Sequence, residues 1–227
     1  MDWLSMRWRD GLFAHWPVDP SVVDAHLPDG VDVATYDGSA WLGIVTFVMD
    51  DIRPRGIPVG RSFPEANLRT YVEYEGKSGV YFFSLDADDH LSVSVARSAY
   101  SLPYYRAEMT VDRTDDGLRF RSERRHPGEP RARLDVTYRE RDEASFVPDA
   151  DSLEGFLTEN YRFYTRGRRL YRGDISHDPW TLTPATATFH EESLFRAAGF
   201  EPPSGDPRLH VASPLDVSAG PLRPVDD

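Results

Sequence analysis

Residues 65–87 read EANLRTYVEYEGKSGVYFFSLDA, and this stretch decides the fold. Two runs rich in Tyr, Val and Phe, at 67–75 and 79–87, lie on either side of the segment GKSG at 76–79. Aromatic and β-branched residues favour strands, whereas Gly and Ser favour turns. The sequence therefore predicts two antiparallel strands joined by a tight turn.

Similar strand signals continue on both sides of this hairpin. Residues 31–38 and 39–51 are apolar and β-branched, and the Asp37-Gly38 pair between them is typical of a two-residue hairpin turn. We therefore expect these two runs to pair as antiparallel strands. Runs of alternating character, separated by turn residues, predict further strands at 104–112, 117–125, 131–140, 169–177 and 208–220.

Short helices are predicted between the strands. Asp19 can cap the first helix, with Pro20 at its first helical position, and Asp86 or Asp88 can cap the second. Gly199 follows an amphipathic run and is a typical C-terminal stop. The pattern predicts helices at 19–28, 88–100, 151–160 and 189–199.

Many strands with few short helices indicate an α+β fold built on an antiparallel, closed or nearly closed β-barrel with a few flanking helices. No internal repeat and no low-complexity linker divides the 227 residues, so we expect a single domain over 1–227. Closure of a barrel removes exposed strand edges and leaves an interior in which a small ligand can bind.

Composition excludes several functional classes. The sequence has no cysteine, which rules out disulfides, thiolate nucleophiles and Cys-ligated metals. Acidic residues outnumber basic ones by 38 to 26, and the net charge of −12 opposes binding to nucleic acids. No apolar run is long enough to span a membrane, so we expect a cytoplasmic protein without a membrane partner.

The basic residues are almost all arginine, because Lys77 is the only lysine. Lysine depletion combined with abundant Asp is typical of the salt-adapted surface of a halophilic protein, in which hydrated carboxylates maintain solubility. A GC-rich genome would explain the loss of lysine but not the acidity. The histidines show no HxH or HExxH spacing, and nucleotide-binding and GxSxG motifs are absent, so we expect no metal and no cofactor.

Several runs of the chain resemble the YqjF-like proteins, the domain of unknown function 2071 family. These runs extend over nearly the whole sequence: WLGIVTFVMDDIRPRGIP, FPEANLRTYVEYEGKSGVYFFSLDA, SAYSLPYYRAEM, LTENYRFYTR and HDPWTL. The resemblance implies a fold similar to acetoacetate decarboxylase, which is a β-barrel with flanking helices and an interior pocket.

In acetoacetate decarboxylase the lysine that forms the Schiff base follows a proline, and the segment Pro103-Tyr104-Tyr105 looks like its counterpart. A phenol cannot form an imine, so the resemblance implies a pocket without Schiff-base chemistry. Lys77 lies in the predicted turn, where we expect it to be solvated and not catalytic. Strand alternation sends one of the two tyrosines inward, where it donates a hydrogen bond to a ligand or fills the core.

Four polar-tipped residues occupy every second position of one predicted strand and therefore share one face: Glu65, Asn67, Arg69 and Tyr71. If this face is exposed, it is an ordinary sheet surface. If it lines the barrel, Glu65 and Arg69 can form a buried pair that orients a carbonyl or carboxylate ligand, with donors from Asn67 and Tyr71. The family resemblance favours the pocket.

Three functional hypotheses follow. In the first, Glu65 is a base, Arg69 an electrostatic stabiliser and Tyr104 an acid for non-covalent chemistry on a small, anionic or carbonyl-containing molecule. Tyr105, His177 and Trp180 are further candidates for ligand contact, the last two through a His-Asp-Pro-Trp turn. The alternatives are a sensory module that binds without turnover and a structural domain with a solid aromatic interior, and the sequence leaves homo-oligomerisation open.

Overall fold

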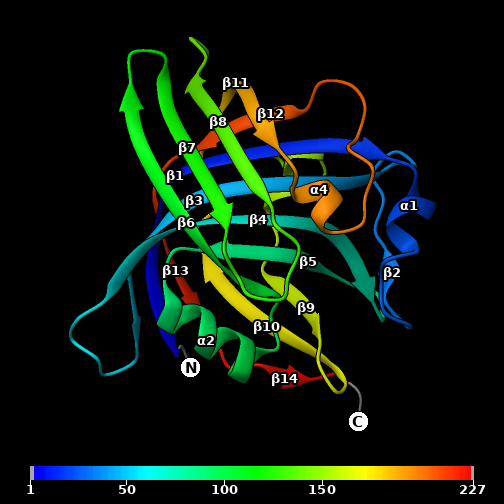
Figure 1. Cartoon of the computed structure of the whole chain (residues 1–227). Coiled ribbons are helices and arrows are strands. Elements are labelled where there is room, and N and C mark those ends of the chain that lie inside the picture. Colours follow the sequence, from blue (N-terminus) through cyan, green and yellow to red (C-terminus); the bar gives the residue numbers. More distant parts are fainter. Residues whose placement is uncertain (1–2, 226–227) are drawn as a thin grey trace.

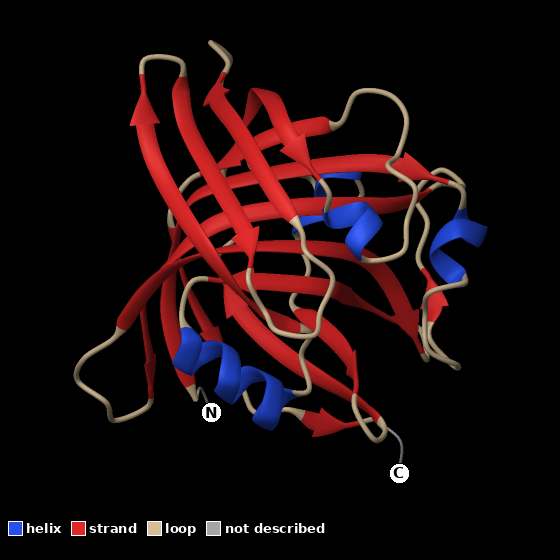
Figure 2. Ribbon diagram, viewed as in Figure 1, coloured by secondary structure: helices blue, strands red, loops and turns tan. Residues whose placement is uncertain are grey.

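The computed structural model describes residues 3–225; within its second helix, the side chains of residues 95, 96 and 98–100 lie outside the description. Most of the chain forms strands, with a few short helices (Figures 1 and 2). The helices are α1 (Pro20–Asp24), α2 (His90–Tyr100), α3 (Leu153–Thr158) and α4 (Leu194–Ala197). The strands are β1 (Leu4–Val18), β2 (Asp32–Val33), β3 (Ala40–Pro54), β4 (Arg61–Tyr74), β5 (Lys77–Ala87), β6 (Tyr104–Thr114), β7 (Gly117–Arg124), β8 (Arg133–Glu140), β9 (Arg162–Arg166), β10 (Leu170–His177), β11 (Leu182–Glu192), β12 (Arg208–Ala212), β13 (Leu215–Ala219) and β14 (Arg223–Pro224).

The strands form a near-closed ring, as the sequence predicts. Strand β1 pairs with β3, β3 with β4, and β4 with β5. From β5 the pairing continues through β9, β10 and β13 and returns to β1, which closes one ring. A second path leaves β5 through β6, β7, β8, β11 and β12 and also returns to β1. The sheet β1-β3-β4-β5 is therefore a wall shared by two rings.

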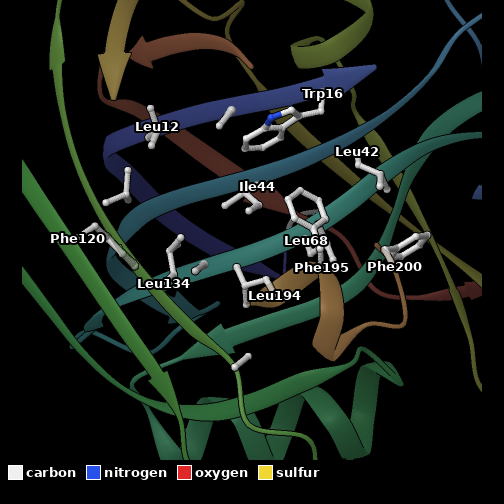
Figure 3. Close-up of a cluster of buried hydrophobic side chains, with 14 of the residues drawn as sticks. Leu12, Trp16, Leu42, Ile44, Leu68, Phe120, Leu134, Leu194, Phe195 and Phe200 are labelled. Atoms are coloured by element: carbon white, nitrogen blue, oxygen red, sulfur yellow. The ribbon is translucent and has the colours of Figure 1, made fainter. Parts of the chain in front are cut away.

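One face of this shared wall packs into a solid apolar core (Figure 3). Leu12 and Trp16 of β1, Ile44 of β3 and Leu68 of β4 are buried there against Phe120 of β7 and their neighbours. The side chains that alternate with these point to the opposite face of the wall, into the ring that contains β9, β10 and β13. The second face is the one that builds the candidate site.

The hairpin that decides the fold is confirmed. Strands β4 and β5 are antiparallel, with Tyr74 opposite Lys77. The turn itself is Glu75-Gly76, with φ of 50° and 72°, so it is two residues long and lies one position earlier than the GKSG segment suggests. Positive φ at both turn residues matches the right-handed twist of the flanking strands.

The predicted hairpin of residues 31–38 and 39–51 is wrong. Asp37 and Gly38 do form a tight turn with φ of 48° and 79°, closed by a bridge between Tyr36 and Ser39. The short strand β2, however, pairs with β4 and not with β3. The reason is that β3 is already flanked by β1 and β4 and has no free edge.

Several other elements also depart from the prediction. Residues 189–192 of the predicted helix 189–199 are the end of β11, and residues 194–197 form the single-turn helix α4. Strands β1, β9, β11 and β14 were not predicted, and residues 208–220 form two strands, β12 and β13. Within the described residues no helix is long and apolar enough to cross a membrane.

The sheet is also not wholly antiparallel. Strand β6 pairs in parallel with β5, and so does β9. Parallel neighbours need a crossover connection, and between β5 and β6 this connection is α2. Asp89, and not Asp86 or Asp88, caps the helix by accepting hydrogen bonds from the backbone N–H groups of Leu91 and Ser92 at 2.9 and 3.3 Å.

Candidate functional site: a cavity inside the smaller ring

A cavity of about 520 Å³ lies inside the ring made by β1, β3, β4, β5, β9, β10 and β13. Its walls are mainly apolar and aromatic, with a few polar side chains: Trp3, Leu4, Met6, Trp8, Arg9, Phe13, Val45, Phe47, Met49, Ile52, Ile57, Val59, Arg61, Phe63, Glu65, Asn67, Arg69, Phe82, Leu85, Leu91, Ser92, Leu102, Tyr104, Phe163, Ile175 and Trp180, among others. The hypothesis of a barrel packed solid with aromatic residues is therefore wrong.

Strand β4 supplies most of the polar side chains of the cavity. Arg61, Phe63, Glu65, Asn67 and Arg69 all line it, because side chains at every second position of a strand point to the same face. Opposite them in the register of β3 are, in the same order, Ile52, Met49, Phe47, Val45 and Gly43. The face that the alternation pattern marks out therefore points inward as far as Arg69.

Glu65 is 2% exposed and has two hydrogen-bond partners among the described residues. The Tyr104 hydroxyl donates to its Oε2 at 2.7 Å, and the Asn67 side-chain amide donates to its Oε1 at 3.4 Å. Burial opposes the charged form of the carboxyl group and raises its pKa, whereas the two hydrogen bonds lower the pKa. Burial is the larger effect, and the pKa of Glu65 is raised from 4.5 to about 7. A carboxyl group with this pKa can both accept and release a proton near neutral pH.

Tyr104 reaches Glu65 because of the parallel junction between β5 and β6. Tyr104 is paired with Leu85, and both side chains line the cavity. Burial and the neighbouring Glu65 carboxylate hold the pKa of Tyr104 well above its usual value of 10. The phenol is therefore neutral and is a hydrogen-bond donor.

Three buried polar atoms on the cavity wall have no protein hydrogen-bond partner. They are the indole Nε1 of Trp8, the amide Oδ1 of Asn67 and the guanidinium Nε of Arg69. Buried polar atoms without a partner are rare, because each costs the desolvation of the group. A polar ligand that displaced the side chains covering these atoms would find two donors and one acceptor.

Arg69 does not pair with Glu65, contrary to the expected buried ion pair. Its guanidinium donates to the Leu157 carbonyl at 3.3 Å and lies over the rings of Phe13 and Tyr71, at 5.3 and 5.7 Å from their centroids. No carboxylate of the residues that the structure describes forms an ion pair with it. The contacts of Arg69 are therefore with neutral groups, and the carboxylate of a bound ligand would be the first to form an ion pair with it.

Gly43 of β3 leaves room for the Arg69 side chain. A Cβ on Gly43 would lie 2.6 Å from the His15 ring and 3.6 Å from Cγ of Arg69. His15 is fully buried, and burial holds its pKa well below 6.5. The neutral His15 ring and the Arg69 side chain can lie side by side only because residue 43 lacks a side chain.

The structure places three expected site residues outside the cavity. The Tyr71 hydroxyl donates to the Leu157 carbonyl at 2.6 Å and lies 2.7 Å from Nε2 of His15, so its polar end is already bonded within the protein. Tyr105 points to the other side of the sheet, where its ring packs under the Arg124 guanidinium at 4.1 Å. His177 does not line the cavity but packs behind its wall, with its ring 5.3 Å from that of Trp180 and 4.6 Å from that of Tyr161. None of the three lines this cavity, and their roles in ligand contact stay predictions.

Trp180, by contrast, lines the cavity and is 5% exposed. It stacks on Trp8 at 5.9 Å and meets Phe13 edge to face at 5.1 Å. Trp8 itself was missed by the sequence prediction. The sequence pattern that could have identified it is the apolar residue at every second position at the start of β1: Leu4, Met6 and Trp8. All three line the cavity.

Lys77 is exposed at the start of β5, as expected, and does not line the cavity. The only amine side chain of the sequence is thus remote from Glu65 and Tyr104. Among the described residues no three His, Cys, Asp or Glu side chains gather as ligands for a metal ion.

Comparison with known sequences identifies relatives over nearly the whole chain. The model of the DUF2071 family, described as an uncharacterized conserved protein, matches residues 5–216. The uncharacterized protein YqjF of Bacillus subtilis (strain 168) is 44% identical over 224 residues, which cover 97% of this chain and 91% of YqjF.

Solved structures with the same architecture are much more distant in sequence. The enduracididine biosynthesis enzyme MppR complexed with pyruvate has a TM-score of 0.66 at 16% identity, over 100% of this chain and 91% of MppR. An acetoacetate decarboxylase from Legionella pneumophila has a TM-score of 0.63 at 15% identity, over 98% of this chain and 87% of that chain. At these identities the likeness establishes the fold. The chain is therefore a member of the DUF2071 family, with the fold of acetoacetate decarboxylase-like enzymes.

Proposed function

We propose that the cavity binds a carbonyl compound that carries a carboxylate, and that Glu65 transfers a proton to and from the carbon next to the carbonyl. The observation that carries this proposal is the buried Glu65 on the cavity wall, hydrogen-bonded to Tyr104 and with a pKa of about 7. A general base works best when its pKa lies near the working pH.

Each polar residue of the wall has a part in the proposed step. Arg69 lines the cavity, and its guanidinium, which no carboxylate of the described residues pairs with, holds the carboxylate of the ligand. Ionised Glu65 removes a proton from the carbon, the C–H electron pair moves into the C–C bond, and the carbonyl π pair moves onto oxygen to give an enolate. Once Glu65 is protonated, the Tyr104 hydroxyl leaves it and donates its one hydrogen bond to the enolate oxygen. Return of the proton from Glu65 to the carbon restores the carbonyl compound, so the cycle exchanges a proton without a covalent intermediate.

A Schiff base is not part of this proposal. The lysine needed for an imine has no equivalent on the wall, since Tyr104 stands in the segment that resembles the lysine site and Lys77 is exposed. MppR has been solved with pyruvate, so a protein of this fold binds a small keto acid. That ligand belongs to MppR, and it supports the class of compound proposed here.

The test is hydrogen–deuterium exchange at the carbon next to the carbonyl of 3-oxo acids, followed by proton NMR in deuterated buffer. We expect the wild type to accelerate exchange and Glu65→Gln to lose about 100- to 10,000-fold of that rate. Glu73→Gln is the matched control, because Glu73 lies on the same strand but is exposed.

The competing hypothesis is a sensor that binds the same ligands without turnover. The unpartnered atoms of Trp8, Asn67 and Arg69 serve binding whether or not a reaction follows. Binding by wild type and Glu65→Gln alike, with no exchange above the rate in buffer, would establish the sensor and refute the role of Glu65 as a base.

A further inference from the structure

We infer that the ligand of this cavity is amphipathic: a carbonyl or carboxylate headgroup bound at Glu65, Asn67 and Arg69, joined to a long alkyl chain that runs along β4 to the cavity mouth. This inference rests on the proposed function for the headgroup and adds the substrate class. It is carried by the size of the cavity, by the position of three polar side chains at the inner end of β4, and by the composition of its mouth.

The cavity is far larger than a short keto acid. Its volume is about 520 Å³. Cavities of this size, about 300 to 1,000 Å³, take drug-sized organic molecules. A three- or four-carbon acid would leave most of the apolar wall in contact with water.

Three polar side chains of β4 gather at the inner end of its inward row, while Arg61 is the charged residue at the mouth. Glu65, Asn67 and Arg69 are consecutive on the inward face, and Phe63 follows toward the mouth. Met49 of β3 is paired with Phe63, and Trp8 of β1 is paired with Met49, so an apolar band crosses three strands at this level. From Glu65 to Arg61 the strand rises about 13 Å. From Arg69, which binds the carboxylate, to Arg61 it rises about 26 Å, so a chain of roughly 18 carbons is needed to run from the headgroup site to the mouth.

The mouth is apolar although it meets solvent. Among the described residues, Trp3, Ile57, Val59 and Leu91 are large hydrophobic side chains that are 50% to 76% exposed and also line the cavity. They come from the start of β1, the loop between β3 and β4, and the start of α2, which lie together toward the lower left of Figure 1. Exposed apolar side chains that gather at a pocket entrance mark a binding surface for apolar groups.

An ion pair connects two of the elements that form the mouth. Arg61 of β4 and Asp89, which caps α2, form a two-fold contact between the guanidinium and the carboxylate, in which Nη2 and Oδ1 are 3.0 Å apart. This pair ties the start of α2, including Leu91, to Arg61, which is the first residue of β4 and the one nearest the mouth. The apolar rim is thus attached to the same strand that carries the headgroup site.

The test is calorimetric titration with saturated carboxylates of increasing length: butanoate, hexanoate, octanoate and decanoate. Burial of each methylene is expected to tighten binding about fourfold, or about 15-fold per two carbons, until the chain reaches the mouth. Arg69→Met is expected to weaken all four ligands by a similar factor of about 10 to 100, because it removes the headgroup contact and leaves the chain path intact. Thermal unfolding checks that this variant is folded.

Variants of the rim locate the path of the chain. Val59→Asp is expected to weaken octadecanoate, whose chain is long enough to reach the mouth, at least tenfold and to leave butanoate unchanged. Val22→Asp is the matched control, because Val22 is an exposed valine on α1 that does not line the cavity. Equal effects of the two variants on octadecanoate would overturn the path through the rim.

The two proposals fail in different ways. If affinity does not depend on chain length while short 3-oxo acids undergo Glu65-dependent exchange, the amphipathic ligand is refuted and the proposed function stands. If affinity rises with chain length but no 3-oxo acid of any length undergoes exchange, the proton transfer is refuted and the chain path stands.

Discussion

Glu65 is a carboxyl group kept in an apolar wall, and this has a consequence for stability as well as for chemistry. Its pKa is about 7 in the folded protein and about 4.5 when exposed to water. Between these two values the folded state binds the proton more tightly than the unfolded state does. The contribution of Glu65 to the free energy of unfolding is therefore full below about pH 4.5 and falls as the pH rises through about 7.

We predict that the difference in free energy of unfolding between Glu65→Gln and the wild type grows by about 2 kcal/mol from near pH 5 to near pH 8, in favour of the variant. Glutamine resembles the protonated acid and does not titrate. Urea unfolding of both proteins at the two pH values measures this. A constant difference would show that Glu65 titrates as an exposed carboxyl group does.

Tyr104 provides a direct check on the same titration. Its hydrogen bond lowers the pKa of Glu65, so Tyr104→Phe is expected to move the midpoint above about 7. Carbon-13 NMR of the Glu65 carboxyl carbon measures the midpoint. Tyr105→Phe is the control, because the neighbouring phenol lies on the other side of the sheet and should leave the midpoint unchanged.

For individual residues, the sequence predicts the direction of a side chain better than its hydrogen-bond partners. Alternation alone places Glu65, Asn67 and Arg69 on one face. It cannot show that Glu65 bonds to Tyr104 rather than to Arg69, because that depends on the junction of β5 with β6, which are separated by α2 in the chain. For the same reason it could not show that the hydroxyl of Tyr71 is bonded to the Leu157 carbonyl of α3.

Among the elements, the junction of β5, β6 and β7 is held by an ion pair that lies behind the site. Arg124 of β7 donates to both oxygens of Asp86 of β5, at 2.6 and 2.8 Å, and both side chains are almost fully buried. The ring of Tyr105 on β6 packs against the guanidinium. The pair thus fixes the two strands that bring Leu85 and Tyr104 together at the cavity wall.

We predict that Asp86→Ala destabilises the protein by about 3 to 5 kcal/mol, because it leaves the charge of Arg124 buried without a partner. The double variant Asp86→Leu with Arg124→Met should recover most of this loss, since no buried charge remains. Urea unfolding of the single and double variants measures the coupling. Asp112→Ala, which breaks an exposed pair with Arg121, should cost less than about 1 kcal/mol.

Elements with strong local signals were predictable, and those defined by distant partners were not. The β4–β5 hairpin carries its own turn, and α1 carries its own cap in Asp19. In β1 the strand-like sequence pattern is interrupted by Arg9-Asp10-Gly11. At this point Asp10 has a φ of 54° and the register with β3 shifts. Residues 189–192 have a helical spacing, but pairing with Asp135 and Leu134 of β8 keeps the chain extended.

For the whole molecule, the charge distribution gives a prediction about salt. The net charge is −12, and many arginines on the surface are already paired with carboxylates, as Arg119 is with Asp135. We expect the repulsion of the excess acidic groups to dominate, so that the temperature of unfolding rises from low salt to molar potassium chloride. Thermal unfolding measures this, and equal or lower stability at molar salt would contradict a salt-adapted surface.

The wall shared by the two rings has a consequence for protein engineering. Along β4 the residues facing the cavity alternate with Ala66 and Leu68, which are fully buried in the solid core. A library restricted to positions 63, 65, 67 and 69 would therefore change the chemistry of the cavity while the packing of the neighbouring ring is left untouched. Selection for new ligands and selection for a folded protein would act on separate positions of one strand.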